Sequence, residues 1–366
     1  MRFIVQREVF MRPLMQVVGV VERRQTMAIL SNILVVARGG RISLTATDLE
    51  VELKSECEGN VTEEGETTVP ARKLADICRA LPDGSTFDFS LKQDRVTLKS
   101  GPSRFSLAVL GAQDFPTVDA IDLGSMVEVE KSQLAEIIDR AAFAMAHQDV
   151  RYYLNGLLLE LRSGALRGVA TDGHRLSIVE VTSEHGLTER SQMIVPRKGV
   201  MELQRMMADG QGSVKVSFGR NHVRIGLSDG QFTSKLIDGK FPDYESVVPA
   251  AAERKALVNR QALREALQRV AILSSEKYRG VRLDFTDESL SLTAHNPEQE
   301  EAQETLSSAS NCAGLSVGFN VNYLMEALNA LRGTEILFCM RDAASSALLR
   351  EVDSELIRQV VMPLKL

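Results

Sequence analysis

The sequence predicts an α+β protein of three tandem similar domains, each with two helices packed on antiparallel sheet. A short phrase occurs three times and begins at residues 45, 169 and 293, so the offset is 124 residues both times. Within each copy, apolar residues follow a helical spacing in some segments and alternate in others. A period of this length is the size of a domain, and it is too long for a solenoid repeat.

The helices are predicted from apolar residues that recur at intervals of three and four. The first helix of the first domain is expected over residues 7–21. Its counterparts carry stripes at Leu134, Ile137, Ile138 and Ala141, and at Leu263, Leu267, Val270 and Ala271. The second helix of each domain carries Leu74, Ile77, Cys78 and Leu81, then Val200, Leu203 and Met207, then Leu324, Leu328 and Leu331. Pro70 and Pro196 precede two of these helices, as is typical of a helix start.

Between the helices the apolar residues alternate, as in half-buried antiparallel strands. Examples are residues 42–45, 49–53, 176–178 and 290–293, and glycine-containing turns separate such segments. We place the linkers near residues 119–127 and 249–256. The three predicted domains are therefore residues 1–124, 125–252 and 253–366.

Composition narrows the class of protein. No run of 18 apolar residues exists, and charged residues interrupt the N-terminal segment too early for a secretory signal. The four cysteines are scattered and the five histidines lack metal-ligand spacing, so we expect a cytoplasmic chain with no metal and no cofactor. A net charge of −6 on its own argues against nucleic-acid binding.

The strongest catalytic candidate is the second copy of the repeated phrase. Asp172 could orient His174 as a general base. Alternatively, residues 171–175 form a tight turn in which the aspartate bonds to its own backbone. The repeat favours the turn, because the first copy has Asp48 with no histidine and the third has Asn296. Phosphate-binding and nucleophile motifs are missing, so we expect no catalytic residue.

Basic and aromatic residues recur at equivalent helix ends. Arg72 and Lys73 begin one helix, and Arg197 and Lys198 begin its counterpart. Positive charge there opposes the helix dipole, so the recurrence suggests another use. The segments that follow the first helix of each domain contribute Arg24, then Gln148, Arg151, Tyr152 and Tyr153, then Arg279. This set is suited to phosphate contact and base stacking.

Six segments together resemble the bacterial DNA polymerase III beta subunit, the sliding clamp family. They are residues 145–156 (MAHQDVRYYLNG), 169–176 (VATDGHRL), 195–199 (VPRKG), 240–244 (KFPDY), 296–301 (NPEQEE) and 360–366 (VVMPLKL). The resemblance implies a DNA clamp fold that closes into a ring as a head-to-tail homodimer around double-stranded DNA. A ring holds DNA by topology, so a net charge of −6 is compatible with that role. The basic and aromatic set above would then face the DNA.

The implied function is that of a DNA polymerase processivity factor without catalysis of its own. It would tether the replicative polymerase, the clamp loader and repair polymerases by their short linear motifs, away from any membrane. A hydrolase using Asp172 and His174, and a dimeric scaffold without a DNA role, are the alternatives. Retention on nicked circular DNA would separate a sliding ring from both.

The resemblance also implies a peptide-binding groove between the second and third domains. Its residues would be Leu154, Thr171, Gly173, His174, Arg175, Leu176, Pro242, Val247, Asn320, Tyr323, Ser346, Val360, Val361, Met362, Pro363 and Leu364. Two positions depart from the family pattern, with Ser246 where Arg is common and Leu364 where Met is common.

At the dimer interface the resemblance implies apolar contacts of Phe105 and Leu107 with Ile272 and Leu273 of a second copy. The acidic residues Glu298, Glu300, Glu301 and Glu304 would face the basic candidates Lys73 and Arg104, unless the acidic run is only a solvated loop. Position 102 is Pro where the family often has Arg, so one ion pair is expected to be absent.

Overall fold

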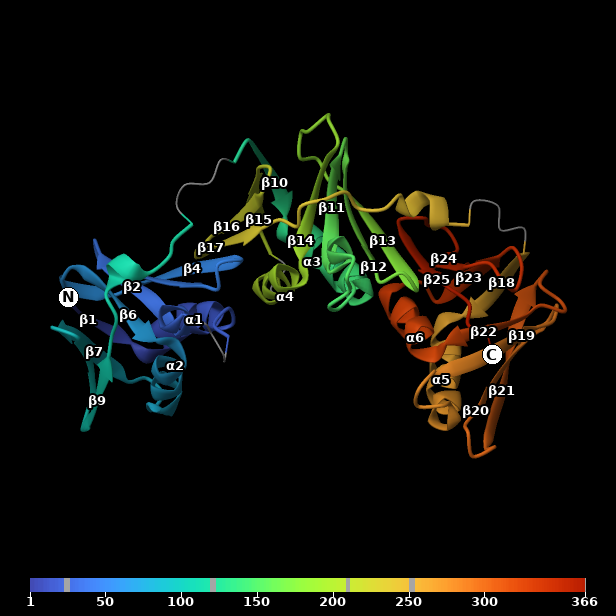
Figure 1. The fold of residues 1–366 in the computed structure, drawn as a ribbon, viewed down its shortest axis with the longest axis horizontal. Coiled ribbons are helices and arrows are strands. Elements are labelled where there is room, and N and C mark those ends of the chain that lie inside the picture. The colour runs from blue at the N-terminus through green and yellow to red at the C-terminus, as the bar shows by residue number, and fades with distance from the viewer. Residues whose placement is uncertain (23–26, 119–122, 209–210, 250–253, 366) are drawn as a thin grey trace. The chain divides into compact units, whose positions relative to one another are not determined.

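The computed structural model describes residues 1–22, 27–118, 123–208, 211–249 and 254–365 (Figure 1). The chain forms two compact units, one of Met1–Lys131 with Met201–Leu236 and one of Ser132–Val200 with Ile237–Leu366. The middle predicted domain therefore supplies strands to both units. None of the helices that these ranges describe is both long and apolar enough to span a membrane.

The first unit contains a five-stranded and an eight-stranded antiparallel sheet. In spatial order, the five-stranded sheet is β5 (Asn60–Glu63), β1 (Arg2–Gln6), β7 (Thr86–Lys92), β8 (Arg95–Ser100) and β9 (Ser103–Ala108). The eight-stranded sheet is β10 (Ser125–Glu130), β15 (Ser213–Phe218), β16 (His222–Leu227), β17 (Gly230–Lys235), β4 (Val51–Glu58), β3 (Arg41–Thr47), β2 (Asn32–Arg38) and β6 (Gly65–Pro70). Pairing of β17 with β4 joins strands of the first two predicted domains in one sheet.

Helices α1 (Arg7–Val18) and α2 (Ala71–Ala80) pack together beside these sheets (Figure 1). Aromatic side chains fill the core between α1, β1 and β7, where Phe3 stacks on Phe89 at 4.5 Å and Phe10 meets Phe87 edge-on at 5.2 Å. Helix α1 ends three residues before the predicted residue 21. Gly19 follows Val18, and the backbone continues in a tighter turn in which Val21 donates to the Val18 carbonyl.

The second unit contains one twelve-stranded antiparallel sheet. Its spatial order is β14 (Ser191–Pro196), β11 (Gly156–Arg162), β12 (Ala165–Thr171), β13 (Arg175–Thr182), β25 (Ile357–Val361), β24 (Ala347–Glu351), β23 (Glu335–Met340), β18 (Arg254–Asn259), β21 (Glu301–Ser310), β20 (Ser289–His295), β19 (Gly280–Phe285) and β22 (Ser316–Asn320). Strands β13 and β25 belong to the second and third predicted domains, and their pairing makes the sheet continuous.

Four more helices match the predicted amphipathic segments. They are α3 (Lys131–Ala141), α4 (Arg197–Met206), α5 (Arg260–Val270) and α6 (Val321–Ala330). The predicted stripe of α5 is buried at Leu263, Leu267 and Val270, and α5 packs on α6 and on β20 and β21. Asn259 and Asn320 cap α5 and α6 by accepting backbone N–H groups of the first turn.

The repeated phrase forms a turn in each copy. In the second copy, Thr171 Oγ1 donates to the Arg175 carbonyl at 2.6 Å, and Asp172 Oδ1 accepts the N–H groups of His174 and Arg175. Thr47 and Asp48 make the same bonds in the first copy. The third copy is one residue longer, because its flanking pair is His295 with Glu301. The turn predicted for this phrase is confirmed.

Candidate functional site

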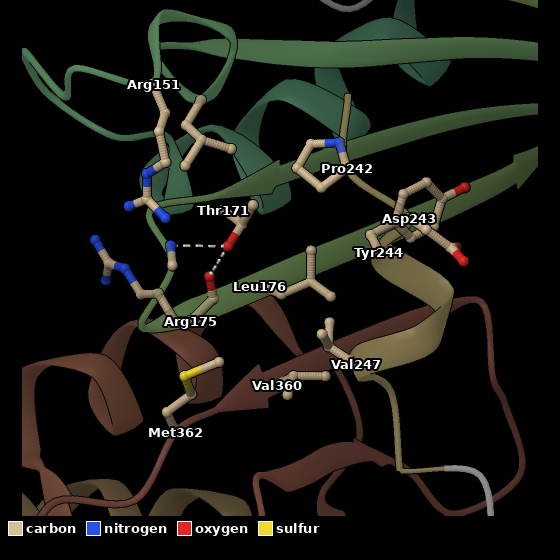
Figure 2. A pocket seen from close by; sticks show the side chains of 12 residues that line it. Arg151, Thr171, Arg175, Leu176, Pro242, Asp243, Tyr244, Val247, Val360 and Met362 are labelled. Carbon is tan, nitrogen blue, oxygen red and sulfur yellow. Dashed lines mark hydrogen bonds between the residues drawn. The ribbon is translucent and has the colours of Figure 1, made fainter. Parts of the chain in front are cut away.

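A cavity of about 230 Å³ opens on the second unit beside the turn of the second copy (Figure 2). Its lining is mostly apolar. It is formed by Arg151, Leu154, Thr171, Gly173, Arg175, Leu176, Pro242, Asp243, Tyr244, Val247, Val360 and Met362. Most of these residues belong to the set expected for the peptide groove, and Arg151, Asp243 and Tyr244 are additions to it.

The floor of the cavity lies where the second and third predicted domains share a sheet. Leu176 on β13 is directly opposite Val360 on β25, and both side chains are buried. Leu154, at the end of the short helix η4 (Tyr152–Leu154), is buried in the same apolar cluster. Figure 2 shows Leu176 at the centre of the lining residues. The floor can therefore hold apolar side chains of a ligand.

One wall comes from residues 242–247, which end in the short helix η5 (Tyr244–Val247). Pro242 and Tyr244 lie on the same side of the cavity in Figure 2. The Tyr244 ring is buried and meets Phe241 edge-on at 6.4 Å, whereas Val247 is 43% exposed. Tyr244 was not expected in the groove, although it closes the KFPDY segment that indicated the site.

Arg175 forms the part of the cavity rim that contacts α6. Its guanidinium lies 4.5 Å from the ring centre of Tyr323 and donates to the Phe143 carbonyl at 2.8 Å. It also pairs with Glu326 on α6. The His174 ring stacks on Tyr323 at the same rim, with 6.4 Å between the two ring centres. His174 and Tyr323 thus border the cavity without lining it.

The arrangement around Asp172 does not orient a catalytic base. Asp172 Oδ1 accepts two backbone N–H groups and Oδ2 accepts Nε of Arg175 at 3.1 Å. Both carboxylate oxygens therefore hold the turn. Across the described ranges, no group of three or more His, Cys, Asp and Glu residues is placed to hold a metal ion.

Arg151 lies at the cavity, whereas it was expected to face DNA. Its guanidinium pairs with Asp149 at 2.8 Å and reaches the Asp172 carbonyl at 3.4 Å. The hydrogen bonds from Arg151 lower the pKa of Asp149 to about 2. Gly173 lies under this guanidinium with φ +89°, and a Cβ there would come within 3.0 Å of Arg151 Nη2. The neighbours Gln148 and Tyr152 are exposed, and Tyr153 is half-buried against the apolar cluster.

The remaining groove candidates anchor the C-terminal segment and α6. Val361 pairs with Arg175 and Ala347 and follows Val360 on β25, so its side chain points to the opposite face of the sheet and does not line the cavity. The Leu364 N–H donates to Gly318, and Pro363 lies half-buried before it. Asn320 caps α6. Ser346 lines a neighbouring hollow of about 480 Å³ that shares Val247 with the main cavity.

Two arginines expected to face DNA hold the backbone that follows other helices. Arg72 Nη2 donates to the Val21 carbonyl at 2.9 Å, and Arg197 Nη1 donates to the Met145 carbonyl at 3.2 Å. This structural role explains part of their recurrence at helix starts. Lys73 is exposed, Lys198 and Arg279 are half-buried, and Arg24 lies outside the described residues.

Most of the interface candidates lie on strand β9, on strand β21 and in a short helix before β19. Strand β9 is the last strand of its sheet, with Phe105 and Leu107 half-buried on one face and Arg104 exposed on the other. Strand β21 pairs with β20 along residues 301–307 and with β18 only at 308–310. In the short helix η6 (Ala271–Leu273), Ile272 is 77% exposed and Leu273 half-buried.

Most carboxylates of the acidic run have partners within the chain. Glu304 accepts Arg269 Nε at 2.9 Å, and His295 lies 3.3 Å from Glu301. Glu300 accepts the Asn296 amide. Glu298 is exposed at the tip of the turn. Three of the four carboxylates of the run therefore have contacts within the chain.

Known proteins match this chain over its whole length. Models of the N-terminal, central and C-terminal domains of the DNA polymerase III beta subunit match residues 1–119, 128–243 and 245–365. The beta sliding clamps of Pseudomonas aeruginosa and Escherichia coli K12 are 47% and 44% identical, each over 100% of both chains. Crystal structures of the Pseudomonas aeruginosa subunit, one of them bound to griselimycin, match with a TM-score of 0.96 and 47% identity over 100% of both chains.

Proposed function

Because this chain belongs to the family of DNA polymerase III beta subunits, we propose that its groove and its two strand edges serve the partner binding and ring closure of a sliding clamp. It is a processivity factor, a non-catalytic accessory subunit of DNA polymerase III. Full-length identity of 47% to a beta sliding clamp, with the same fold throughout, carries this conclusion. The three clamp domains would be residues 1–124, 125–252 and 253–366, in a cytoplasmic protein.

The groove would bind short linear motifs of the replicative polymerase, the clamp loader and repair polymerases. Its apolar floor at Leu176 and Val360 suits aliphatic or aromatic side chains, while Arg151 and Arg175 offer donors at one end. The departures at Ser246 and Leu364 leave this floor intact. Ser246 Oγ donates to the Asp243 carbonyl of its own loop, and Leu364 is held through its backbone N–H.

The ring would close as a head-to-tail homodimer through β9 of one copy and β21 of the other. Both strands present a backbone edge that could extend a sheet across the interface. Phe105 and Leu107 would then meet Ile272 and Leu273, whose exposure is otherwise unfavourable. With Pro102 in place of an arginine, Glu304 keeps its partner Arg269 within the chain. Lys73 and Arg104 would face Glu298 and Glu301.

Double-stranded DNA would pass through this ring and be held by topology. Exposed Lys73, Gln148 and Tyr152 would touch it, together with Arg24, Lys198 and Arg279, while Arg72 and Arg197 mainly fix the backbone. Few strong phosphate contacts would suit sliding, because each tight contact slows movement along the duplex.

The decisive experiment loads the protein onto nicked circular DNA with a clamp loader and ATP, then separates bound from free protein by gel filtration. A sliding ring stays with the circle and is lost when a restriction enzyme linearises the DNA. Retention on linear DNA would contradict topological holding. Failure to be retained on the circle in the presence of an active loader would contradict the proposed ring.

A further inference from the structure

A buried cluster of charges lies behind the Tyr244 wall of the groove. Glu160 on β11 is 0% exposed and stands inside the apolar run Leu157–Leu161. It accepts Arg162 Nε at 3.0 Å and also accepts hydrogen bonds from Arg190 and Gln192. Burial by itself would raise the pKa of Glu160, but hydrogen bonds from Arg190, Tyr244 and Gln192 and the charge of Arg162 outweigh it and lower the pKa. The carboxylate is therefore charged inside the protein.

The hydroxyl of Tyr244 is bound on three sides by this cluster. It donates to Glu160 Oε2 at 2.7 Å and accepts from Arg162 Nη2 at 3.1 Å and Arg167 Nη1 at 3.2 Å. A phenol oxygen has one donor and two acceptor positions, so its capacity is filled. The three bonds fix the height of the Tyr244 ring above the sheet, and that ring lines the cavity.

The next residue, Glu245, fastens the same wall to both predicted domains. Its carboxylate accepts Arg167 Nη1 at 2.5 Å and Arg358 Nη1 at 3.1 Å. Arg167 lies on β12 of the second domain and Arg358 on β25 of the third. The bond to Arg358 thus crosses the junction of the domains directly beside the cavity, and the helix η5 cannot shift without straining both bonds of Glu245.

We propose that Glu160, Arg162, Arg167, Glu245 and Arg358, here called the Tyr244 clamp, are positioning residues that set the width of the peptide groove. This inference rests on the proposed groove function and names the residues that act through Tyr244 and Val247. None of the five lines the cavity. Replacing a buried ion network by apolar residues often leaves stability unchanged, so a role in stability alone does not require one here.

The experiment compares two variants, each of which removes one carboxylate partner of the Arg167 guanidinium. Glu245→Gln removes the partner on the wall, whereas Glu180→Gln removes the partner on β13, which accepts Arg167 Nε at 2.6 Å. Both changes keep the size of the side chain. Affinity of the full chain for griselimycin is measured by isothermal titration calorimetry, and the midpoint of thermal unfolding by calorimetry. Leu176→Ala on the cavity floor reports whether griselimycin occupies the groove.

We expect Glu245→Gln to weaken griselimycin binding about tenfold, equivalent to about 1.4 kcal/mol. Both variants should lower the unfolding midpoint to a similar extent. Glu180→Gln should leave the affinity for griselimycin close to that of the native chain.

Two results would overturn the proposal that the Tyr244 clamp sets the width of the groove. One is unchanged affinity in Glu245→Gln while Leu176→Ala weakens binding. The other is equal weakening in Glu245→Gln and Glu180→Gln, which would reduce the cluster to a stabilising role. Unchanged affinity for griselimycin in Leu176→Ala would instead refute the assignment of the groove. The proposed role of the Tyr244 clamp depends on that assignment and would be refuted as well.

Discussion

Gly173 is the position at which one added methyl group should separate folding from partner binding. Its φ of +89° is in the left-handed region, which disfavours any residue with a Cβ. The Cβ of Gly173→Ala would lie 3.0 Å from Arg151 Nη2 and 3.2 Å from Nη1. Because these atoms end a flexible side chain, the guanidinium moves away, loses its 3.4 Å bond to Asp172 and leaves the rim of the cavity.

The matched control is Gly164→Ala in the hairpin between β11 and β12. Gly164 has φ +73°, and a Cβ there would have nothing within 4 Å. Both variants carry a left-handed penalty of about 1–2 kcal/mol. For a unit of this size that lowers the unfolding midpoint by about 2–4 °C per kcal/mol, or about 2–8 °C. Leu49 takes φ 77° at the same place in the first copy, so the turn itself accepts a side chain.

The two variants should differ only in binding. Gly173→Ala is expected to weaken griselimycin binding about tenfold, the effect of losing about one charge-assisted contact. Gly164→Ala should bind as the native chain does. Scanning calorimetry and titration calorimetry on both proteins check this. Equal affinities in the two variants would refute the reasoning that the second copy has glycine because Arg151 lies over it.

Three further predictions concern the interface, the C-terminus and acid stability. Replacing Ile272 and Leu273 by alanine should yield monomers in sedimentation velocity, and a persistent dimer would contradict the proposed interface. Deleting residues 362–366 removes Met362 from the cavity and the bond to Gly318, so griselimycin binding should be lost while circular dichroism stays native; retained binding would count against the groove. Burial by itself would raise the pKa values of Glu160 and Glu245, but hydrogen bonds to their carboxylates, from Arg190, Tyr244 and Gln192 and from Arg358 and Arg167, lower both. Their stabilisation is complete above the ordinary glutamate pKa and is lost as pH falls through the lowered pKa, so the unfolding midpoint should drop on acidification below that ordinary value, and less steeply in Glu245→Gln.

Local patterns predicted the features that depend on neighbouring residues. The turn of the repeated phrase follows from Thr171 and Asp172, whose side chains bond to backbone two to four residues away. The buried stripe of α5 follows from helical spacing. The resemblance to the clamp family also indicated Leu176 and Val360, which meet on the floor of the cavity.

Contacts between distant residues were missed. Arg151 was predicted to face DNA because it follows a helix beside two tyrosines, and that stays a prediction; the place of its guanidinium at the cavity was not foreseen. The run around Glu160 carried a signal, since a lone carboxylate among leucines must find partners when buried. Which partners it finds was not visible, because Tyr244 is 84 residues away.

By itself, the sequence determined a chain of three similar domains, the turn that recurs in each, and the family whose groove and ring it resembles. These properties depend on residues that are close together along the chain, through helix capping, hydrogen bonds within turns and the spacing of apolar residues. Only the tertiary structure decided that the middle domain shares its strands between two units, that Arg151 and Tyr244 line the cavity, and that Glu245 bonds to Arg167 behind it. The register of β13 against β25 places Leu176 opposite Val360 on the cavity floor, and that register arises from packing across the whole sheet.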